Sequence, residues 1–136
     1  MNIILDSNIL FSALIKDSVT RRLILEYDGF FLFPEFIFDE MIKHKDELLM
    51  KSKMNSGDFN KLLRLLMKKV IIMPNNTIAS YKAESLKIIG KIDQNDAIFI
   101  ACALAYQDSI IWSDDKKLKE QNKVIILNTK EIISFI

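Results

Sequence analysis

Short apolar runs alternate along the chain with longer segments of helical character. The runs are rich in Ile, Val and Phe and none exceeds four residues, which is typical of strands buried on both faces. They predict strands at Ile3–Leu5, Phe30–Phe33, Val70–Met73, Ser109–Trp112 and Val124–Leu127. The intervening segments predict helices at Ser18–Tyr27, Pro34–Met50, Asp58–Lys69, Thr77–Ile89, Asp93–Tyr106, Lys116–Gln121 and, as a final turn, Thr129–Phe135.

This alternation predicts an α/β protein with a three-layer α/β/α architecture, in which helices cover both faces of a five-stranded parallel sheet. The chain has 136 residues, half of them hydrophobic. That length is enough to bury one core and too short for two ordinary domains. We therefore expect residues 1–136 to form a single domain.

Composition excludes several functional classes. The 19 basic and 18 acidic residues nearly cancel, so only a local basic patch could favour a nucleic-acid partner. The chain has no glycine-rich phosphate loop and no G-x-S-x-G motif, which argues against dinucleotide and nucleoside-triphosphate enzymes. The single histidine, His44, gives little scope for a histidine metal site. We expect it at the surface, with nothing nearby to orient it.

The N-terminus and the single cysteine indicate the compartment. "MNIILD" has three apolar residues before an acid, which fits neither a signal peptide nor a membrane span. Cys102 lies inside the apolar run "AIFIACALAY", which indicates a buried structural thiol. We therefore expect a cytoplasmic protein with no membrane partner.

What remains is carboxylate chemistry, and the positions of the acids are informative. Open parallel sheets bind ligands beyond the carboxyl ends of their strands. Asp6 directly follows the first predicted strand, and Asp114 and Asp115 follow the fourth. Asp96 opens the helix that leads into the fourth strand, and a βαβ crossover starts such a helix near the same edge. Glu40, on the helix after the second strand, is a further candidate.

Carboxylates gathered at one edge repel each other, and without a cation some would be protonated at neutral pH. A hard divalent ion resolves this conflict. Mg²⁺ or Mn²⁺ takes oxygen ligands, keeps several waters, and is typically held by one or two carboxylates plus substrate phosphate oxygens. Such a site activates water and offsets the charge that develops on a phosphodiester. Metal-assisted phosphodiester hydrolysis is therefore the chemistry that we expect.

Four motifs, in this order, resemble those of the PIN domain family, which includes many small ribonucleases. "ILDSNIL" resembles the family's strand followed by Asp-x-Asn, and "FPEFIFDEM" resembles the stretch that carries its second acid. "DQNDAIFIACAL" resembles the D-x-x-D-A helix start, and "IIWSDDKKL" the strand that leads into (Ser/Thr)-x-Asp-x-x-Leu. The resemblance implies that the catalytic, metal-binding acids are Asp6, Glu40, Asp96 and Asp115. It implies that the supporting residues are Asn8, Ser113 and Asp93.

By this resemblance the protein is a toxin-type, VapC-like ribonuclease that cuts single-stranded RNA with Mg²⁺ or Mn²⁺. Asp6 and Asp96 would hold the principal ion, while Glu40 and Asp115 would ligate it through water or bind a second ion. Small PIN proteins of this type are often dimers that an antitoxin inactivates, so the resemblance implies a homodimer and an antitoxin partner. Asp114 stands where the family often has Gly or Asn, and we expect it to face solvent or cap a helix.

Local charge and one apolar helix leave alternatives open. Eight basic residues and three acids fall between Lys43 and Lys69, either as a solvated helical face or as a track for the RNA backbone. "DFNKLLRLLMKK" carries more apolar surface than one core-facing stripe requires, which favours core packing but also fits a dimer interface. The candidate nucleic-acid contacts are Lys43, Lys45, Lys116 and Lys117.

Three other classes compete with this interpretation. A receiver domain calls for an acidic pair after the first strand, where Asp6 stands alone. Dehalogenase-like phosphatases call for Asp-x-Asp after the first strand, where this chain has "DSN". A catalytically silent PIN-fold module that binds RNA or a protein usually loses acids, whereas all four positions are retained here. We therefore expect an enzyme, with the silent module as the alternative.

Overall fold

Parallel strands form the centre of the molecule, whose computed structural model describes residues 1–89 and 94–136. The strands are β1 (Asn2–Leu5), β2 (Phe31–Pro34), β3 (Val70–Met73), β4 (Ser109–Trp112) and β5 (Ile125–Leu127). Within the described residues these five strands make one sheet in the order β3-β2-β1-β4-β5, and every pairing is parallel. The predicted α/β class, with its five-stranded parallel sheet, is confirmed.

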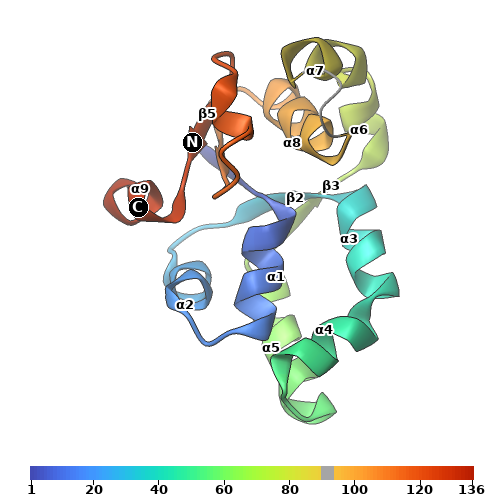
Figure 1. Ribbon diagram of the computed structural model, residues 1–136, viewed down its shortest axis with the longest axis vertical. Coiled ribbons are helices and arrows are strands. Elements are labelled where there is room, and N and C mark those ends of the chain that lie inside the picture. Colours follow the sequence, from blue (N-terminus) through green and yellow to red (C-terminus); the bar gives the residue numbers. More distant parts are fainter. Residues whose placement is uncertain (90–93) are drawn as a thin grey trace.

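Helices cover both faces of this sheet. They are α1 (Ser7–Ile15), α2 (Val19–Glu26), α3 (Glu35–Lys43), α4 (Lys45–Ser52), α5 (Ser56–Met67), α6 (Asn75–Ala79), α7 (Lys82–Ile89), α8 (Gln94–Ala105) and α9 (Thr129–Phe135). Figure 1 shows α6, α7 and α8 on one side of the sheet and α1, α2 and α5 on the other. The helix α8 packs on β1, β2 and β4, and α9 packs on β5.

The neighbouring strands β1 and β4 determine where the acids lie. Leu5 and Trp112, the last residues of the two strands, are paired in register. The ladder continues one step beyond them, because the Asp6 N–H donates to the Trp112 carbonyl at 3.0 Å. Asp6 and Ser113 therefore leave the sheet side by side, although they are 107 positions apart in sequence.

Apolar side chains hold this edge of the sheet rigid. Leu5 and Trp112 are completely shielded from solvent, as are Leu10 and Leu14 of α1. Burying one such aliphatic side chain contributes roughly 1.5–3 kcal/mol. The rings of Phe31 and Trp112 also meet, with their centroids 5.9 Å apart. The residues that follow β1 and β4 thus start from a firmly packed base.

One helix was absent from the sequence prediction. The residues of α1 fall between the first predicted strand and the first predicted helix, and none of the predicted helices covers them. Its buried positions are Ile9, Leu10, Ala13 and Leu14, a spacing that matches one face of a helix. The signal was therefore present in the sequence.

Two long predicted helices are each broken. The predicted helix Pro34–Met50 divides at His44, whose φ of −104° and ψ of 22° leave the helical region. The break lets α3 pack on β2 and β3 while α4 packs on α1, so tertiary packing overrides a continuous helical pattern. The predicted helix Thr77–Ile89 is divided into α6 and α7. Of the predicted helix Lys116–Gln121, only Leu118–Glu120 is helical, as a 3₁₀ turn.

Burial decides two questions that the sequence raised. Phe59, Leu62 and Leu66 of α5 are buried, while Leu65 is 42% exposed, so core packing accounts for most of the apolar face of this helix. Cys102 is a buried free cysteine, and burial raises the pKa of its thiol to about 12, as for an inert structural cysteine. Among the described residues, no helix is both long and apolar enough to cross a bilayer.

Candidate metal and nucleic-acid site

Asp6 is a buried carboxylate at the carboxyl end of β1. It is 4% exposed and directly precedes α1, whose dipole favours a negative charge at this end. Its Oδ2 accepts a hydrogen bond from the Ser113 hydroxyl at 2.6 Å. Its Oδ1 accepts a longer one, at 3.4 Å, from the hydroxyl of Ser7. Hydroxyl groups from two chain segments therefore fix the orientation of this carboxylate.

The pKa of Asp6 is raised above its ordinary value. Desolvation by burial is the largest cause, and the negative charge of Asp115 adds to it, while hydrogen bonds from Ser113 and Ser7 oppose the shift. The influence of Asp115 means that the two carboxylates lie within electrostatic reach of each other. Ionising Asp6 is therefore costly unless a cation compensates for its charge.

Ser113 joins Asp6 to Asp115. It is completely buried and follows β4, where its N–H donates to the Leu127 carbonyl at 3.0 Å. Its hydroxyl donates to Asp6 and, at 3.0 Å, accepts the backbone N–H of Asp115. One hydroxyl group thus links the two segments that carry these acids, which is the geometry expected of a supporting residue.

Asp6 and Asp115 line one pocket together with Asn8, which we call the Asp6 pocket. Asn8 is exposed on the first turn of α1, so its amide can reach a ligand or a water. Ser12 and Thr20 add hydroxyl groups to the lining. Neither was predicted from the sequence, although Ser12 lies four residues after Asn8 and so shares its helix face.

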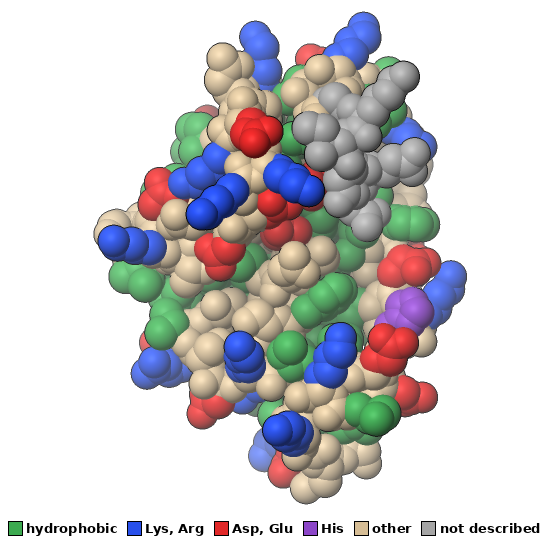
Figure 2. Space-filling model, viewed as in Figure 1, with side chains coloured by type: hydrophobic (Ala, Val, Ile, Leu, Met, Phe, Trp, Pro, Cys, Tyr) green, Lys and Arg blue, Asp and Glu red, His purple; other side chains and the backbone are tan. Residues whose placement is uncertain are grey.

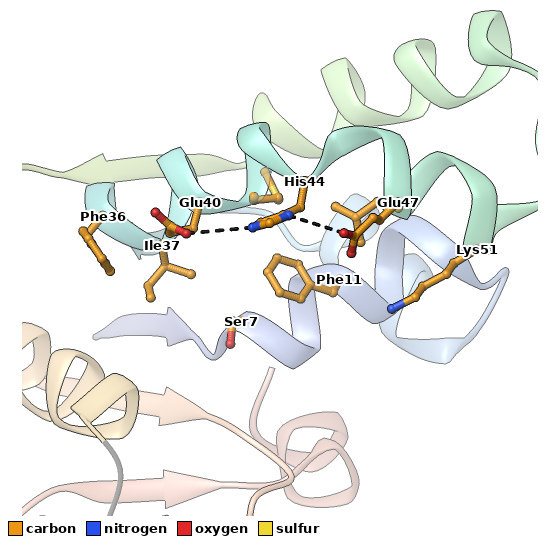
Figure 3. Close-up of a pocket in the computed structure, with 10 residues that line it drawn as sticks. Ser7, Phe11, Phe36, Ile37, Glu40, His44, Glu47 and Lys51 are labelled. Atoms are coloured by element: carbon orange, nitrogen blue, oxygen red, sulfur yellow. Dashed lines mark ion pairs between the residues drawn. The ribbon is translucent and has the colours of Figure 1, made fainter.

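Glu40 lies in a neighbouring groove between α1, α3 and α4, which we call the Glu40 groove (Figure 3). Ser7, next to Asp6 in the chain, lines this groove as well. Lys43 pairs with Glu40, with 3.3 Å between Nζ and Oε1. Glu40 does not line the Asp6 pocket, and its role as a fourth acid stays a prediction.

His44 is a surface side chain, as expected, with 59% of it exposed. Its Nε2 lies 4.0 Å from Glu40 Oε2, and its Nδ1 lies 3.6 Å from Glu47 Oε1. Figure 3 shows the ring between the two carboxylates, above Phe11. The prediction that nothing nearby orients this histidine is therefore wrong, because α3 and α4 place a carboxylate on either side of it.

Asp96 lies in the first turn of α8 and is 6% exposed. Since α8 leads into β4 and packs on β1 and β4, the βαβ connection places this first turn toward the carboxyl edge of the sheet. That Asp96 shares a metal ion with Asp6 and Asp115 stays a prediction. Asp93, the additional acid suggested by the motif, lies outside the described residues.

Asp114 binds the C-terminal helix. Its two carboxylate oxygens accept the N–H and the hydroxyl of Thr129, at 2.8 and 2.9 Å. The Thr129 hydroxyl also accepts the indole N–H of Trp112 at 3.0 Å. We call these three bonds the Thr129 clamp. Asp114 is exposed and caps a helix, as expected, but that helix is α9 rather than the segment directly after it.

The four lysines predicted to contact nucleic acid differ in their surroundings. Lys43 is exposed but already pairs with Glu40, and Lys45 is half-buried. Lys116 and Lys117 are exposed in the loop that follows β4. This loop therefore offers lysines closer to Asp115 in the chain than α3 and α4 do.

A second pocket shares residues 114 and 115 with the Asp6 pocket, and we call it the lysine pocket. Figure 2 shows basic and acidic side chains close together over the C-terminal segments on this face. Two of its lysines were not predicted from the sequence, because only the packing of η1 (Leu118–Glu120) and α9 brings them to this loop. The lysine pocket is lined by Ser113, Asp114, Asp115, Lys116, Lys119, Asn128 and Lys130.

The donor set fits a hard divalent cation that also binds water and substrate. Among the described residues, no three His, Cys, Asp or Glu side chains lie close enough to hold an ion on their own. Mg²⁺ and Mn²⁺ need fewer protein ligands, because one or two carboxylates plus waters and phosphate oxygens suffice. Asp6, which is desolvated, and the adjacent Asp115 provide such a pair.

The fold and the pocket define the class of the protein: a parallel α/β domain with carboxylates and other oxygen donors at the carboxyl edge of its sheet. The family profile described as "PIN domain" matches residues 4–131. The chain therefore belongs to the PIN domain family, which confirms the resemblance carried by the four motifs.

A solved structure has the same fold. It is the crystal structure of VapBC2 from Rickettsia felis bound to a DNA fragment from their promoter. The match has a TM-score of 0.68 at 18% sequence identity and covers 94% of this chain and 98% of that chain. At this identity the likeness concerns the fold alone. A search of curated protein sequences finds no match.

Proposed function

We propose that the protein is a divalent-metal-dependent endoribonuclease that hydrolyses phosphodiester bonds of single-stranded RNA. One observation carries the proposal: Ser113 holds the buried Asp6 and the segment of Asp115 together, in a pocket that Asn8 also lines. Two neighbouring carboxylates, one of them with a raised pKa, favour a bound cation. Membership of the PIN domain family supports this assignment.

The acids would hold Mg²⁺ or Mn²⁺. Asp6 and Asp115 come from the ends of β1 and β4, Asp96 would join them from α8, and Glu40 would act from the adjoining groove through water or on a second ion. The ion, when bound, supplies positive charge against the charge that develops on the phosphodiester. The protein's own contribution is to keep these oxygen ligands in place beforehand.

Neutral side chains complete the proposed arrangement. Ser113 orients the Asp6 carboxylate through its hydroxyl and fixes the Asp115 backbone through the same oxygen. Asn8, exposed on the wall of the Asp6 pocket, orients a water or a ligand by its amide group. Hydrolysis consumes one water and breaks one P–O bond, which leaves a 5′-phosphate and a 3′-hydroxyl.

We further propose that the protein is the toxin of a toxin–antitoxin pair and works as a homodimer. The chain shares the fold of the VapBC2 structure from Rickettsia felis, and that likeness supports the proposal. The Glu40 groove offers an apolar lining beside an acid, with Phe11, Ile37 and Met41. A segment of an antitoxin that lay in this groove would cover Glu40.

The test is cleavage of a labelled single-stranded RNA in Mn²⁺ or Mg²⁺ by the wild type, D6N and D96N. We expect metal-dependent cleavage by the wild type and losses on the order of 100-fold in each variant, the usual cost of removing one group that stabilises a transition state electrostatically. A quadruple variant at Asp6, Glu40, Asp96 and Asp115 reports any contaminating nuclease. Unchanged activity in D6N or D96N would remove the assignment, and RNA binding without cleavage would favour the silent module.

A further inference from the structure

The lysines of the lysine pocket have no part in the metal site described above. We propose that this pocket binds a backbone phosphate of the substrate strand, next to the bond that is cut. This proposal rests on the proposed ribonuclease function. Asp114 and Asp115 form a wall common to this pocket and the Asp6 pocket. Two pockets that share a wall can hold neighbouring phosphates of one strand. The lysine pocket is lined by Lys116, Lys119 and Lys130, which do not line the Asp6 pocket.

The Thr129 clamp builds this pocket into the fold. Thr129 donates twice to Asp114 and accepts from Trp112, which is itself completely buried in the core. The start of α9 is therefore tied to the loop that carries Asp115, and Lys130 directly follows the clamp residue. The position of Lys130 relative to the acids is thus set by hydrogen bonds and not by a free surface loop.

The charges of the pocket leave two lysines for a phosphate. Lys119 pairs with Glu131, and this contact lowers the pKa of the Glu131 carboxyl. Lys116 and Lys130 are exposed, and within residues 1–89 and 94–136 neither forms an ion pair. Exposed lysine ammonium groups that form no ion pair are free to bind the oxygens of a phosphate.

The other basic side chains near the acids are less suited to this task. Lys43 is paired with Glu40, and Glu47 lies on the same groove. An RNA phosphate that approached along α3 and α4 would therefore meet two carboxylates. The lysine pocket has carboxylates of its own, but Asp114 is hydrogen-bonded to Thr129, and Lys116 and Lys130 form no ion pair in the described part of the chain. This difference in pairing favours phosphate contacts on the side of α9.

The test measures RNA affinity separately from cleavage. In an Asp6→Asn background, which should slow cutting on the order of 100-fold, fluorescence anisotropy gives the dissociation constant of a labelled, unstructured oligoribonucleotide at several salt concentrations. The K116A/K130A variant removes both unpaired lysines. The matched control is K87A, which removes an exposed lysine on α7 that does not line this pocket. Circular dichroism checks that each variant is folded.

One phosphate contact on a single strand contributes about 0.7 to the slope of log affinity against log salt. K116A/K130A should lose about this much slope and bind RNA more weakly at low salt, while K87A keeps both values. Between 50 and 200 mM salt a slope of 0.7 amounts to roughly a threefold change in affinity. The loss should be the same for different RNA sequences, as for a phosphate contact.

A second variant changes the binding in the opposite direction. Glu131 and Asn128 form a capping box at the start of α9, and Gln at this position preserves such a box. Glu131→Gln therefore keeps the helix start while releasing Lys119, and RNA binding should tighten. Thr129→Val, which removes the hydroxyl of the clamp, should weaken RNA binding, and Thr129→Ser should restore it.

The outcomes separate this proposal from the proposed function. Equal affinities and salt slopes for K116A/K130A and K87A would overturn the phosphate pocket, even if the wild type cuts RNA. A wild type that does not cut RNA, but whose variants shift its binding as described, would remove the ribonuclease and leave the phosphate pocket standing. Looser or unchanged binding by Glu131→Gln would also count against the pocket.

Discussion

The Asp6 pocket and the Glu40 groove adjoin each other, yet they hold their acids in opposite ways. Asp6 is 4% exposed and is fixed by a buried hydroxyl, that of Ser113, at 2.6 Å. The Glu40 side chain is 40% exposed and pairs with Lys43 at 3.3 Å. One carboxylate therefore has neutral donors in a desolvated setting, and the other has a cation in a hydrated one.

This difference indicates which acid needs a cation from outside. Desolvation raises the pKa of Asp6, and Asp115 raises it further, so a divalent ion would relieve a cost that the folded chain already bears. Glu40 gains little from a further cation because water and Lys43 already compensate for its charge. The comparison favours the Asp6 pocket as the place of the principal ion, with Glu40 in an auxiliary position.

The largest expected contrast is in catalysis. Asp115→Asn should lower kcat/KM for single-stranded RNA on the order of 100-fold, because it removes one of the three carboxylates that line the Asp6 pocket, the one within electrostatic reach of Asp6. Glu40→Gln should lower it no more than about tenfold, which is about 1.4 kcal/mol of activation free energy. Both are measured in Mn²⁺ with folding checked by circular dichroism. Equal losses of kcat/KM in the two variants would contradict the distinction between the Asp6 pocket and the Glu40 groove.

The next contrast concerns the two serines that donate to Asp6. Ser113→Ala leaves a buried carboxylate and the Asp115 N–H without the shared hydroxyl, which should cost about 1–3 kcal/mol of unfolding free energy. Ser7→Ala removes a 3.4 Å bond of a half-buried side chain and should cost about 0.5 kcal/mol or less. Urea unfolding measures both. A Ser113→Ala cost no larger than that of Ser7→Ala would mean that Ser113 does not hold the acids together.

The sheet could be predicted because its strands are short, uninterrupted apolar runs, of which the three central ones, β1, β2 and β4, are largely buried. Val70–Met73 and Ser109–Trp112 were predicted with the observed bounds, although Val70–Met73 is an edge strand whose Ile71 is 50% exposed. Asp6 and Asp115 followed from the ends of such strands. Helix breaks were harder to predict, because the division at His44 serves the packing of α3 and α4 on different neighbours.

The parts of the site that depend on distant contacts could not be predicted. Asp114 finds its partner 15 residues further on, in Thr129, and no local spacing signals that pairing. Lys130 reaches the acids by the same clamp, and the carboxylates around His44 depend on where α3 ends. The capping box at Asn128 and Glu131 is different, because its three-residue spacing can be read from the sequence.

A third contrast between Asp6 and Glu40 concerns the stability of the metal-free protein. The folded protein holds the Asp6 proton more tightly than the unfolded chain does, because the pKa is raised from 3.8 by burial. The resulting stability is fully present below the unfolded value and is lost as the pH rises through the folded pKa. Asp6→Asn, which stays uncharged, escapes that loss.

In EDTA, Asp6→Asn should therefore melt above the wild type at pH 7, and the difference should shrink as the pH falls below 3.8. Mn²⁺ should stabilise the wild type in preference to the variant. Thermal unfolding measures both effects, and Glu40→Gln, on an exposed side chain, is the control from the other region. A variant that melted below the wild type at pH 7 without metal would contradict the claim that ionised Asp6 is held at a cost.

The smallest effect is expected at His44, which lines the Glu40 groove. Its ring is 59% exposed and lies 4.0 and 3.6 Å from Glu40 and Glu47, and exposed pairs of this kind contribute about 0–1 kcal/mol. His44→Gln should therefore change unfolding free energy by less than about 0.5 kcal/mol and kcat/KM by no more than about twofold. A tenfold loss of kcat/KM with unchanged stability would show that the groove acts on the substrate directly. Glu40 would then have to be treated as an equal partner of Asp6, with His44 as the residue that orients it.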